Sequence, residues 1–281
     1  ALSSSEFNSL TDEAISNLYT RIKVIARALP KDKTRMVKIL QAPDLVVGMT
    51  GDGINDAGAL KLADVGFAMG SGTEVAKEAG DIIILDDNIA SITKSVLFGR
   101  TIFKSIRKFI IFQLTVNFCA MLMAIVGPIM DIVTPVTVIQ MLWINMIMDT
   151  LAGIAFASEP SLDEYMNEPP KTKKVHIINS YMFKEIFFTG LYTSLLGIFF
   201  FKSPLVYNFI RYADDYRYLY TAYFAFFIFS SLLNALNART TRLNILANIL
   251  KNKPFILIFT SISIIQMYLI YFGGDLFRTY G

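Results

Sequence analysis

Two carboxylates lie close together in a short glycine-rich stretch of the chain. Residues 50–56, which we call the acidic loop, read TGDGIND and include Asp52 and Asp56. They follow an apolar run at residues 45–48. An acidic loop after a buried parallel strand is where open α/β sheets bind ligands. Two nearby carboxylates suit a hard cation such as Mg²⁺ with a phosphate beside it. Gly-Asp-Gly is also common turn chemistry, so an ordinary surface turn stays open on this stretch alone.

Polar side chains inside long apolar stretches form a second group of candidates. Asp149 is acidic and lies well inside such a stretch, with Asn145 four residues before it. Residues four apart share one face of a helix, and an ionisable group at bilayer depth usually faces a pathway or a partner. Gln113 and Asn117 have the same spacing in the preceding stretch. Amides in membrane helices often only pair with neighbours, so Asn117 fits either interpretation.

The segment around the acidic loop alternates short strands with helices. We expect strands at residues 22–26, 45–48, 65–69 and 82–85, and helices at residues 12–19, 32–40, 56–62 and 73–79. Pro30 should stop the first strand, and a capping box from Ser71 to Glu74 should start the last helix. This alternation predicts a parallel sheet with crossover helices, the tail of a doubly wound domain whose earlier strands precede Ala1.

The composition excludes an ordinary soluble protein. The chain has 281 residues, of which 54% are hydrophobic, and its mean hydropathy is +0.49. Membrane spans must supply this excess, because residues 1–108 hold a normal mixture of charges. The net charge of +3 is mild and gives no argument for nucleic acid. Cys119 is the single cysteine, so no intrachain disulfide can form.

Apolar stretches after residue 108 are each long enough to cross a hydrocarbon core as a helix of roughly 20 residues. The expected spans are residues 109–129, 135–157, 182–201, 219–237 and 254–272. Basic residues gather before the first span, after the second and after the fourth. The positive-inside rule thus predicts that residues 1–108 are cytosolic and that Gly281 is outside, with Asp214 and Asp215 in a solvated exterior link. An odd number of spans is consistent with a missing final helix.

Residues 25–85 closely resemble the end of the phosphorylation domain of P-type ATPases, which has a haloacid-dehalogenase-like fold. The motifs that carry the resemblance are TGDGIND at 50–56, ADVGFAMG at 63–70 and AKEAGD at 76–81. One departure is Gly58, where the family usually has proline. This change could loosen the start of a helix, but it removes no ligand.

The resemblance assigns roles to the residues of the acidic loop. It implies that Asp52 holds Mg²⁺, between Gly51 and Gly53 at the cofactor site. Asn55 and Asp56 would order the loop and the phosphate. Lys33 matches the family lysine that contacts the phosphoryl oxygens, where a positive charge offsets the charge of the transferring group.

The first two spans resemble helices five and six of plasma-membrane-type calcium ATPases. The matching segments are QLTVN at 113–117 and QMLWINMIMDTLA at 140–152. The resemblance implies that Ca²⁺ is bound by Asn117, Asn145 and Asp149. Ala120 and Met148 stand where pumps that carry two Ca²⁺ have a glutamate and a threonine. One Ca²⁺ per cycle is therefore expected, with further ligands from an absent fourth helix.

The sequence thus predicts three parts. Residues 1–98 form the C-terminal part of an α/β haloacid-dehalogenase-like domain, residues 99–108 a stalk, and residues 109–281 an all-α transmembrane bundle. The resemblance implies the C-terminal part of an ATP-driven, plasma-membrane Ca²⁺ pump that uses Mg²⁺ and an aspartyl-phosphate intermediate. The family's phosphorylated motif, Asp-Lys-Thr-Gly-Thr, does not occur in residues 1–281, and neither does a nucleotide-binding domain. We therefore expect that the missing N-terminal part of the pump is the partner of this chain, which alone should not hydrolyse ATP.

Two other functions fit parts of this pattern. A membrane-tethered phosphatase of the haloacid dehalogenase type would not need Asp149 with Asn145 and Asn117. A non-catalytic membrane scaffold would not need Asp52, Asn55 and Asp56. Because residues 99–127 contain no proline, one helix of about 40 Å could join the two candidate sites and couple them.

Overall fold

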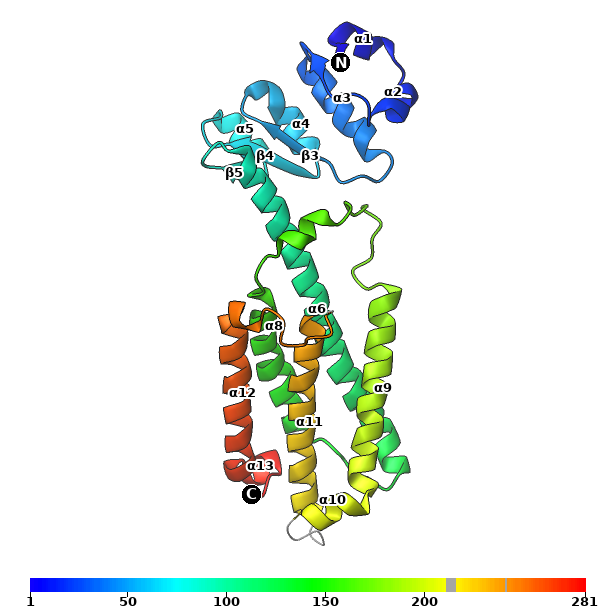
Figure 1. Ribbon diagram of the computed structural model, residues 1–281, viewed down its shortest axis with the longest axis vertical. Coiled ribbons are helices and arrows are strands. Elements are labelled where there is room, and N and C mark those ends of the chain that lie inside the picture. The colour runs from blue at the N-terminus through cyan, green and yellow to red at the C-terminus, as the bar shows by residue number, and fades with distance from the viewer. Residues whose placement is uncertain (211–215, 241) are drawn as a thin grey trace. The chain divides into compact units, whose positions relative to one another are not determined.

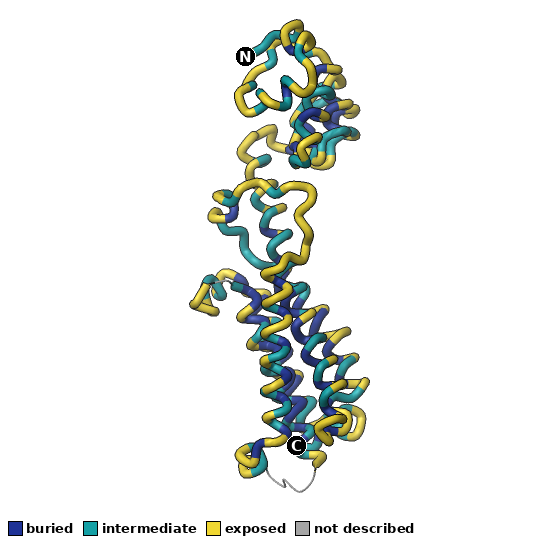
Figure 2. Tube along the Cα trace, turned by 90° about the vertical axis from the view of Figure 1, so that its right-hand side faces the viewer, coloured by how far each residue is buried: buried dark blue, intermediate teal, exposed yellow. Residues whose placement is uncertain are grey.

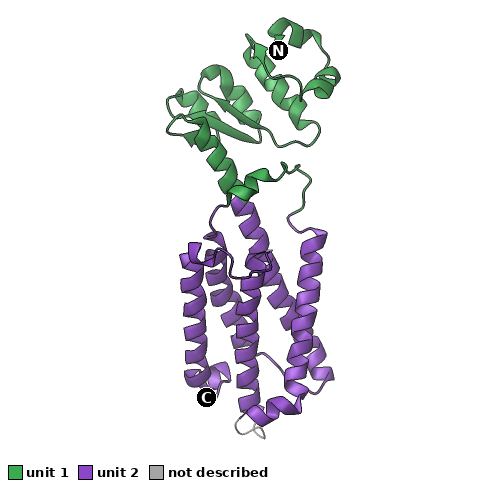
Figure 3. Ribbon diagram, in the orientation of Figure 1, with its two compact units in different colours: residues 1–100, 162–176 green, residues 101–161, 177–281 purple. Residues whose placement is uncertain are grey.

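The computed structural model describes residues 1–210, 216–240 and 242–281. The chain divides into two compact units (Figure 3). Unit 1 contains residues 1–100 and 162–176, and unit 2 contains residues 101–161 and 177–281. Asp214 and Asp215, expected in an exterior link, lie outside the described residues.

Unit 1 contains a parallel sheet of three strands in the order β3-β4-β5. The strands are β3 (Gly48–Gly51), β4 (Val65–Met69) and β5 (Ile82–Ile84). They are joined by the short helix η1 (Ile54–Asp56), α4 (Ala57–Leu62) and α5 (Glu74–Ala79). The predicted parallel sheet with crossover helices is confirmed.

The first 41 residues of unit 1 form a separate small layer. Its elements are β1 (Leu2–Ser3), α1 (Ser4–Ser9), α2 (Asp12–Leu18), β2 (Ile25–Ala26) and α3 (Pro30–Gln41). β1 and β2 pair in parallel with each other and not with the three-stranded sheet. Phe7, Ile15 and Ile39 form the apolar core of this layer.

Three boundaries predicted in unit 1 differ in the structure, each for a local chemical reason. The strand expected at 45–48 instead begins at Gly48 and runs into the acidic stretch, because the Asp64 carboxylate accepts the Val47 amide at 2.8 Å. Pro30 is the first residue of α3 and not only a strand stop, since its missing N–H and fixed φ suit that position. Thr73, rather than Ser71, caps α5, with its hydroxyl accepting from the Ala76 amide at 3.3 Å.

Unit 2 is a bundle of long helices (Figure 1). The long helix α6 (Ile89–Ile129) starts in unit 1 and continues into unit 2. The other main elements are α7 (Val138–Leu142), the π-helix η2 (Trp143–Met148), α8 (Asp149–Ala157), α9 (Ser180–Lys202), α11 (Tyr216–Arg239) and α12 (Lys253–Phe272). Shorter helices are η3 (Asp163–Asn167), α10 (Pro204–Phe209), η4 (Ile249–Lys251) and α13 (Gly274–Phe277).

Within the described residues, five helical segments are long and apolar enough to cross a membrane. They are 89–129, 138–157, 180–202, 216–239 and 253–272, and each of the five predicted spans coincides with one of them. The first helix starts 20 residues before the predicted span, because the stalk and the segment before it belong to the same helix. Buried residues, dark blue in Figure 2, run along the inside of the bundle, and they include the rings of Phe112, Phe156 and Tyr223.

Candidate functional site

The acidic loop of unit 1 is fastened to the start of a helix. β3 ends at Gly51, and the Thr73 amide, at the N-terminus of α5, donates to the Asp52 carbonyl at 2.8 Å. A Cβ atom added at Gly72 would lie 2.8 Å from that same carbonyl oxygen. The close backbone approach therefore requires glycine at position 72 and fixes where Asp52 stands.

Asp56 and Lys33 form an ion pair beside this loop. Asp56 is 6% exposed, and its Oδ1 accepts from the Lys33 ammonium at 2.5 Å. Its other oxygen, Oδ2, accepts from the Gly53 amide at 3.3 Å. A Cβ atom at Gly51 would lie 2.4 Å from the Asp56 Cβ. The structure thus brings together four of the residues selected from the sequence, with Asp56 as the group that holds the loop closed.

The position of Lys33 depends on its neighbour Asp32, which is fully buried. The Asp32 carboxylate accepts from the Ser4 hydroxyl at 2.6 Å, the Asn8 amide at 2.9 Å and the Leu29 backbone amide at 2.9 Å. The Ser4 hydrogen bond, followed by those from Leu29 and Asn8, holds the pKa of Asp32 below its ordinary value. These bonds anchor the first turn of α3, from which Lys33 reaches Asp56.

Asp52 and Asn55 differ from the buried Asp56 in that both are exposed. In the described part of the chain the Asp52 carboxylate makes no hydrogen bond or ion pair. A carboxylate without a protein partner, close to a fixed ammonium–carboxylate pair, has the oxygen chemistry that Mg²⁺ prefers. The residues of this loop therefore fit a bound Mg²⁺ with Asp52 as a ligand.

Asp149 in unit 2 is a buried carboxylate without a hydrogen bond. It is 3% exposed, and neither of its oxygens has a hydrogen-bond partner among the described residues. Gln113, on α6, is its polar neighbour. A buried, unpaired acceptor carries a large desolvation penalty, so such a group in a native fold calls for an ion, a water molecule or a proton. This carboxylate is the strongest candidate for a cation ligand in unit 2.

The segment directly before Asp149, η2, is a π-helix. The Asp149 amide donates to the carbonyl of Ile144, five residues back, at the end of η2. Single π-turns occur frequently at functional sites. Asn145 lies within η2 and is exposed, whereas Asp149 is buried, so the structure does not place these two residues in one buried cluster.

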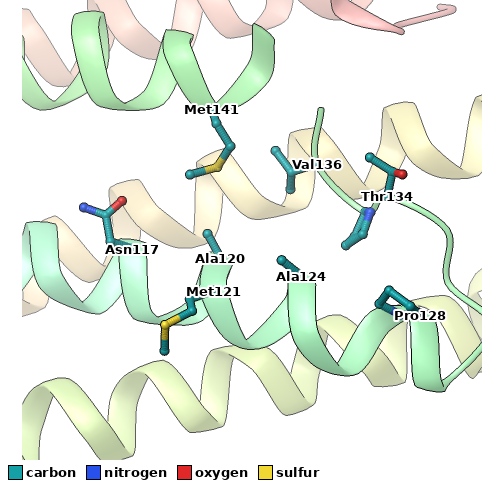
Figure 4. Close-up of a pocket in the computed structure, with 9 residues that line it drawn as sticks. Asn117, Ala120, Met121, Ala124, Pro128, Thr134, Val136 and Met141 are labelled. Carbon is teal, nitrogen blue, oxygen red and sulfur yellow. The ribbon is translucent and has the colours of Figure 1, made fainter. Parts of the chain in front are cut away.

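Asn117 lines a pocket of 410 Å³ between α6 and residues 134–141. Figure 4 shows Asn117, Ala120 and Ala124 along one helix, with Val136 and Met141 across the pocket. The lining is mostly apolar, and Asn117 contributes its one amide. Asn145 and Asp149 do not line this pocket, so the three predicted Ca²⁺ ligands lie in three different surroundings.

Sequence reasoning left two amides of unit 2 out of the candidate site, the half-buried Gln113 and the fully buried Gln266. Gln113 lies beside the Asp149 carboxylate. Its position four residues before Asn117 is the sequence pattern that could have identified it. Gln266, on α12, is fully buried, and both its amide atoms lack partners among the described residues. Its signal was a lone amide within an apolar span. Nowhere in the described ranges do three or more His, Cys, Asp or Glu side chains form a possible metal site, so a cation here would need amide or carbonyl oxygens as well.

A charged cluster at one end of the bundle was also missed. Glu159, just after α8, accepts from Lys108 at 3.5 Å, Arg239 at 3.5 Å and Asn252 at 2.9 Å. Arg239 is only 2% exposed and Asn252 is fully buried. Glu159 thus joins the chain at α6, α8, α11 and α12 through residues that are far apart in the sequence.

Comparison with known families decides the identity of the chain. Residues 133–281 match the family of cation transporting ATPases, in its C-terminal region. The chain belongs to this family. Residues 31–96 of the chain match the haloacid dehalogenase-like hydrolases, which confirms the fold class predicted for the first part of the chain. The P-type ATPase resemblance found in the sequence is confirmed as well.

Curated relatives match nearly the whole of this chain. "Probable calcium-transporting ATPase 9, plasma membrane-type" of Oryza sativa subsp. japonica is 40% identical over 99% of this chain and 27% of its own length. "Calcium-transporting ATPase 2" of Schizosaccharomyces pombe is 38% identical over 97% of this chain and 21% of its length. "Plasma membrane calcium-transporting ATPase mca-1" of Caenorhabditis elegans is 38% identical over 99% of this chain and 24% of its length. The chain thus spans about a quarter of the length of these relatives.

Proposed function

We propose that the complete protein containing this chain is an ATP-driven pump that moves Ca²⁺ out of the cytosol across the plasma membrane. Relatives at 38–40% identity are named calcium-transporting ATPases, and two of those described above carry the words plasma membrane in their names. The observation that carries the proposal is the Asp149 carboxylate, buried in the helical bundle with neither oxygen hydrogen-bonded in the described residues. A tethered phosphatase or a scaffold has no use for such a group at that depth.

In the proposed reaction, the acidic loop of unit 1 prepares the site for the phosphoryl group. Asp52 would hold Mg²⁺, which neutralises charge on the transferring phosphoryl oxygens when bound. Asp56, paired with Lys33 at 2.5 Å, keeps the ammonium beside the loop, where it can bind a phosphoryl oxygen. The Gly53 and Thr73 amides fix the loop backbone through Asp56 and Asp52. ATP and the phosphorylated aspartate are proposed to belong to the part of the pump outside residues 1–281.

We also propose that this pump carries one Ca²⁺ per cycle. Ca²⁺ takes six to eight oxygen ligands, and carboxylates are the strongest among them. Asp149 supplies a carboxylate, and Gln113, Asn117 and Asn145 could supply amide oxygens. Ala120 and Met148 offer no oxygen side chains at the positions that would build a second site. Equilibrium binding of two Ca²⁺ by the complete pump would contradict this stoichiometry.

Ca²⁺-dependent formation of the phosphoenzyme by the complete pump tests the proposed function. Asp149→Asn keeps the shape of the side chain but removes its charge, so half-maximal phosphorylation should need at least about tenfold more Ca²⁺. Thr150→Ala is the matched control, because Thr150 is the next residue, is exposed, and among the described residues its hydroxyl bonds only the Met146 carbonyl. An unchanged Ca²⁺ response in Asp149→Asn would favour another ion or no transport.

A further inference from the structure

The loop between α11 and α12 exposes large apolar side chains. Leu243 is 105% exposed, Leu250 is 80% exposed and Leu246 is 54% exposed. Isolated apolar residues on a surface are ordinary, but a group of three within eight residues marks an interaction surface. We define residues 242–253 as the interfacial loop.

The interfacial loop is held from the inside by buried polar groups. Arg239, which is 2% exposed, donates to the carbonyls of Ile245 at 3.1 Å and Ala247 at 2.5 Å. At the other end Asn252 donates to the Ala155 carbonyl at 3.1 Å and caps α12 by accepting the Phe255 amide at 2.9 Å. With both ends pinned, the backbone faces inward and the leucines are presented outward by a fixed structure.

The same loop carries a net positive charge, with its cations at the two ends. It contains Arg242, Lys251 and Lys253 and no acidic residue. Lys251 and Lys253 are both exposed, and they flank the buried Asn252. Three exposed leucines between cations at the two ends of one short loop suit a surface that is apolar below and anionic above.

The loop lies at a place in the fold where a membrane would present such a surface. The loop joins the end of one membrane-spanning helix at Arg239 to the start of another at Lys253. Figure 1 shows it at the end of the bundle opposite α10 and α13. The distribution of basic residues predicts that this end is cytosolic. The loop therefore lies where the acyl chains of the cytosolic leaflet meet anionic headgroups.

We propose that the interfacial loop is a binding surface for anionic phospholipids of the cytosolic leaflet. Leu243, Leu246 and Leu250 enter the boundary between headgroups and acyl chains, which removes them from water. Lys251 and Lys253, with Arg242, bind the phosphate and carboxylate groups of the lipid. This inference depends on the chain crossing the membrane and is independent of which ion the pump carries.

Photo-cross-linking from position 250 tests the proposal. The complete pump, with photoreactive benzoylphenylalanine in place of Leu250, is reconstituted in nanodiscs of equal parts phosphatidylcholine and phosphatidylserine. Mass spectrometry of the irradiated protein should show lipid adducts enriched in phosphatidylserine. Benzoylphenylalanine in place of Leu85, which is 87% exposed in unit 1, is the control and should give no lipid adduct.

Charge variants separate anionic binding from simple burial of the leucines. Lys251→Gln and Lys253→Gln should each lower the phosphatidylserine enrichment about fivefold, while total lipid adducts at position 250 remain. Equal yields of both lipids in the unmodified loop would overturn the proposal, as would adducts to protein alone. Ca²⁺ uptake by the same samples is scored separately, so loss of transport with intact lipid enrichment would count against the pump function and not against the loop.

Discussion

Gly51 and Gly53 flank Asp52 symmetrically in the sequence, but their surroundings differ. A Cβ atom at Gly51 would overlap the Asp56 side chain at 2.4 Å, whereas the nearest atom to a Cβ at Gly53 is 3.8 Å away. Gly53 has φ −115°, which any residue adopts. Only Gly51 is therefore required by close contact, and the contact is with the residue that binds Lys33.

Alanine substitutions should separate the two glycines. We expect Gly51→Ala to destabilise unit 1 by about 1–3 kcal/mol, because the new methyl group forces Asp56 out of place. Gly53→Ala should change the stability by less than about 1 kcal/mol. Urea unfolding followed by hydrogen exchange of the β3 and β4 amides measures both effects. Equal losses in the two variants would show that the contact with Asp56 is not what selects glycine.

At the residue scale, the sequence predicted which side chains carry chemistry better than it predicted whether those side chains are buried. Asp56 and Lys33 were selected separately and form an ion pair. Asn145 and Asp149 were expected on one helical face, but one is exposed and the other is buried. The spacing rule assumes α-helical hydrogen bonds, but Asn145 lies in the π-helix Trp143–Met148, where the hydrogen bonds span five residues.

The start of α3 makes the position of Lys33 sensitive to acid. The folded-state pKa of Asp32 is lowered by hydrogen bonds from Ser4, Leu29 and Asn8. Its contribution to stability is thus fully present above the unfolded pKa of about 3.9 and is lost as the pH falls through the folded pKa. Asp32→Asn should be less stable than the unmodified chain at neutral pH, with a difference that shrinks below about pH 4. Unfolding titrations at several pH values measure this, and a constant difference would contradict it.

α6 is one element that contains residues of both units, since it runs from Ile89 to Ile129. We expect this helix to couple phosphorylation to ion binding in the complete pump. Ser105→Pro would remove a hydrogen bond and clash with the preceding turn, which disfavours the straight helix by about 3 kcal/mol or more. Ca²⁺ uptake per ATP hydrolysed should fall, while Ser105→Ala should leave it unchanged. If the proline variant transported and hydrolysed normally, the coupling role would be wrong.

At the element scale, hydropathy predicted most of what the structure contains. The spans expected at 135–157, 182–201, 219–237 and 254–272 agree with the helices to within three residues at each end. Boundaries in unit 1 were less predictable, because side chains such as Asp64 and Thr73 decide them locally. The strand predicted at 22–26 is limited to Ile25–Ala26, since among the described residues it pairs only with the two-residue strand β1.

At the scale of the whole molecule, the cluster around Glu159 joins four helices that the sequence treats as separate spans. Glu159→Ala would leave Arg239 buried without its carboxylate, which costs about 3–5 kcal/mol. Thermal unfolding in detergent should show a clear loss of stability. Asp163→Ala, at an exposed acidic residue four positions later, is the control and should have little effect. Adding Arg239→Met to Glu159→Ala should recover stability, and a further loss would contradict the charge explanation.

The π-turn at Trp143–Met148 has a consequence for comparing sequence lengths within the family. A π-turn holds one more residue than an α-turn, so this segment behaves as a one-residue insertion that leaves the flanking helices regular. Deleting one residue there would restore α-helical bonding and leave Asp149 on the same side of the helix, whereas regular α-helical bonding without the deletion would rotate Asp149 by about 100° relative to Thr137. A relative with a regular helix at this place would therefore need its carboxylate one position earlier to present it to the same interior, and an ungapped alignment would pair the wrong residues.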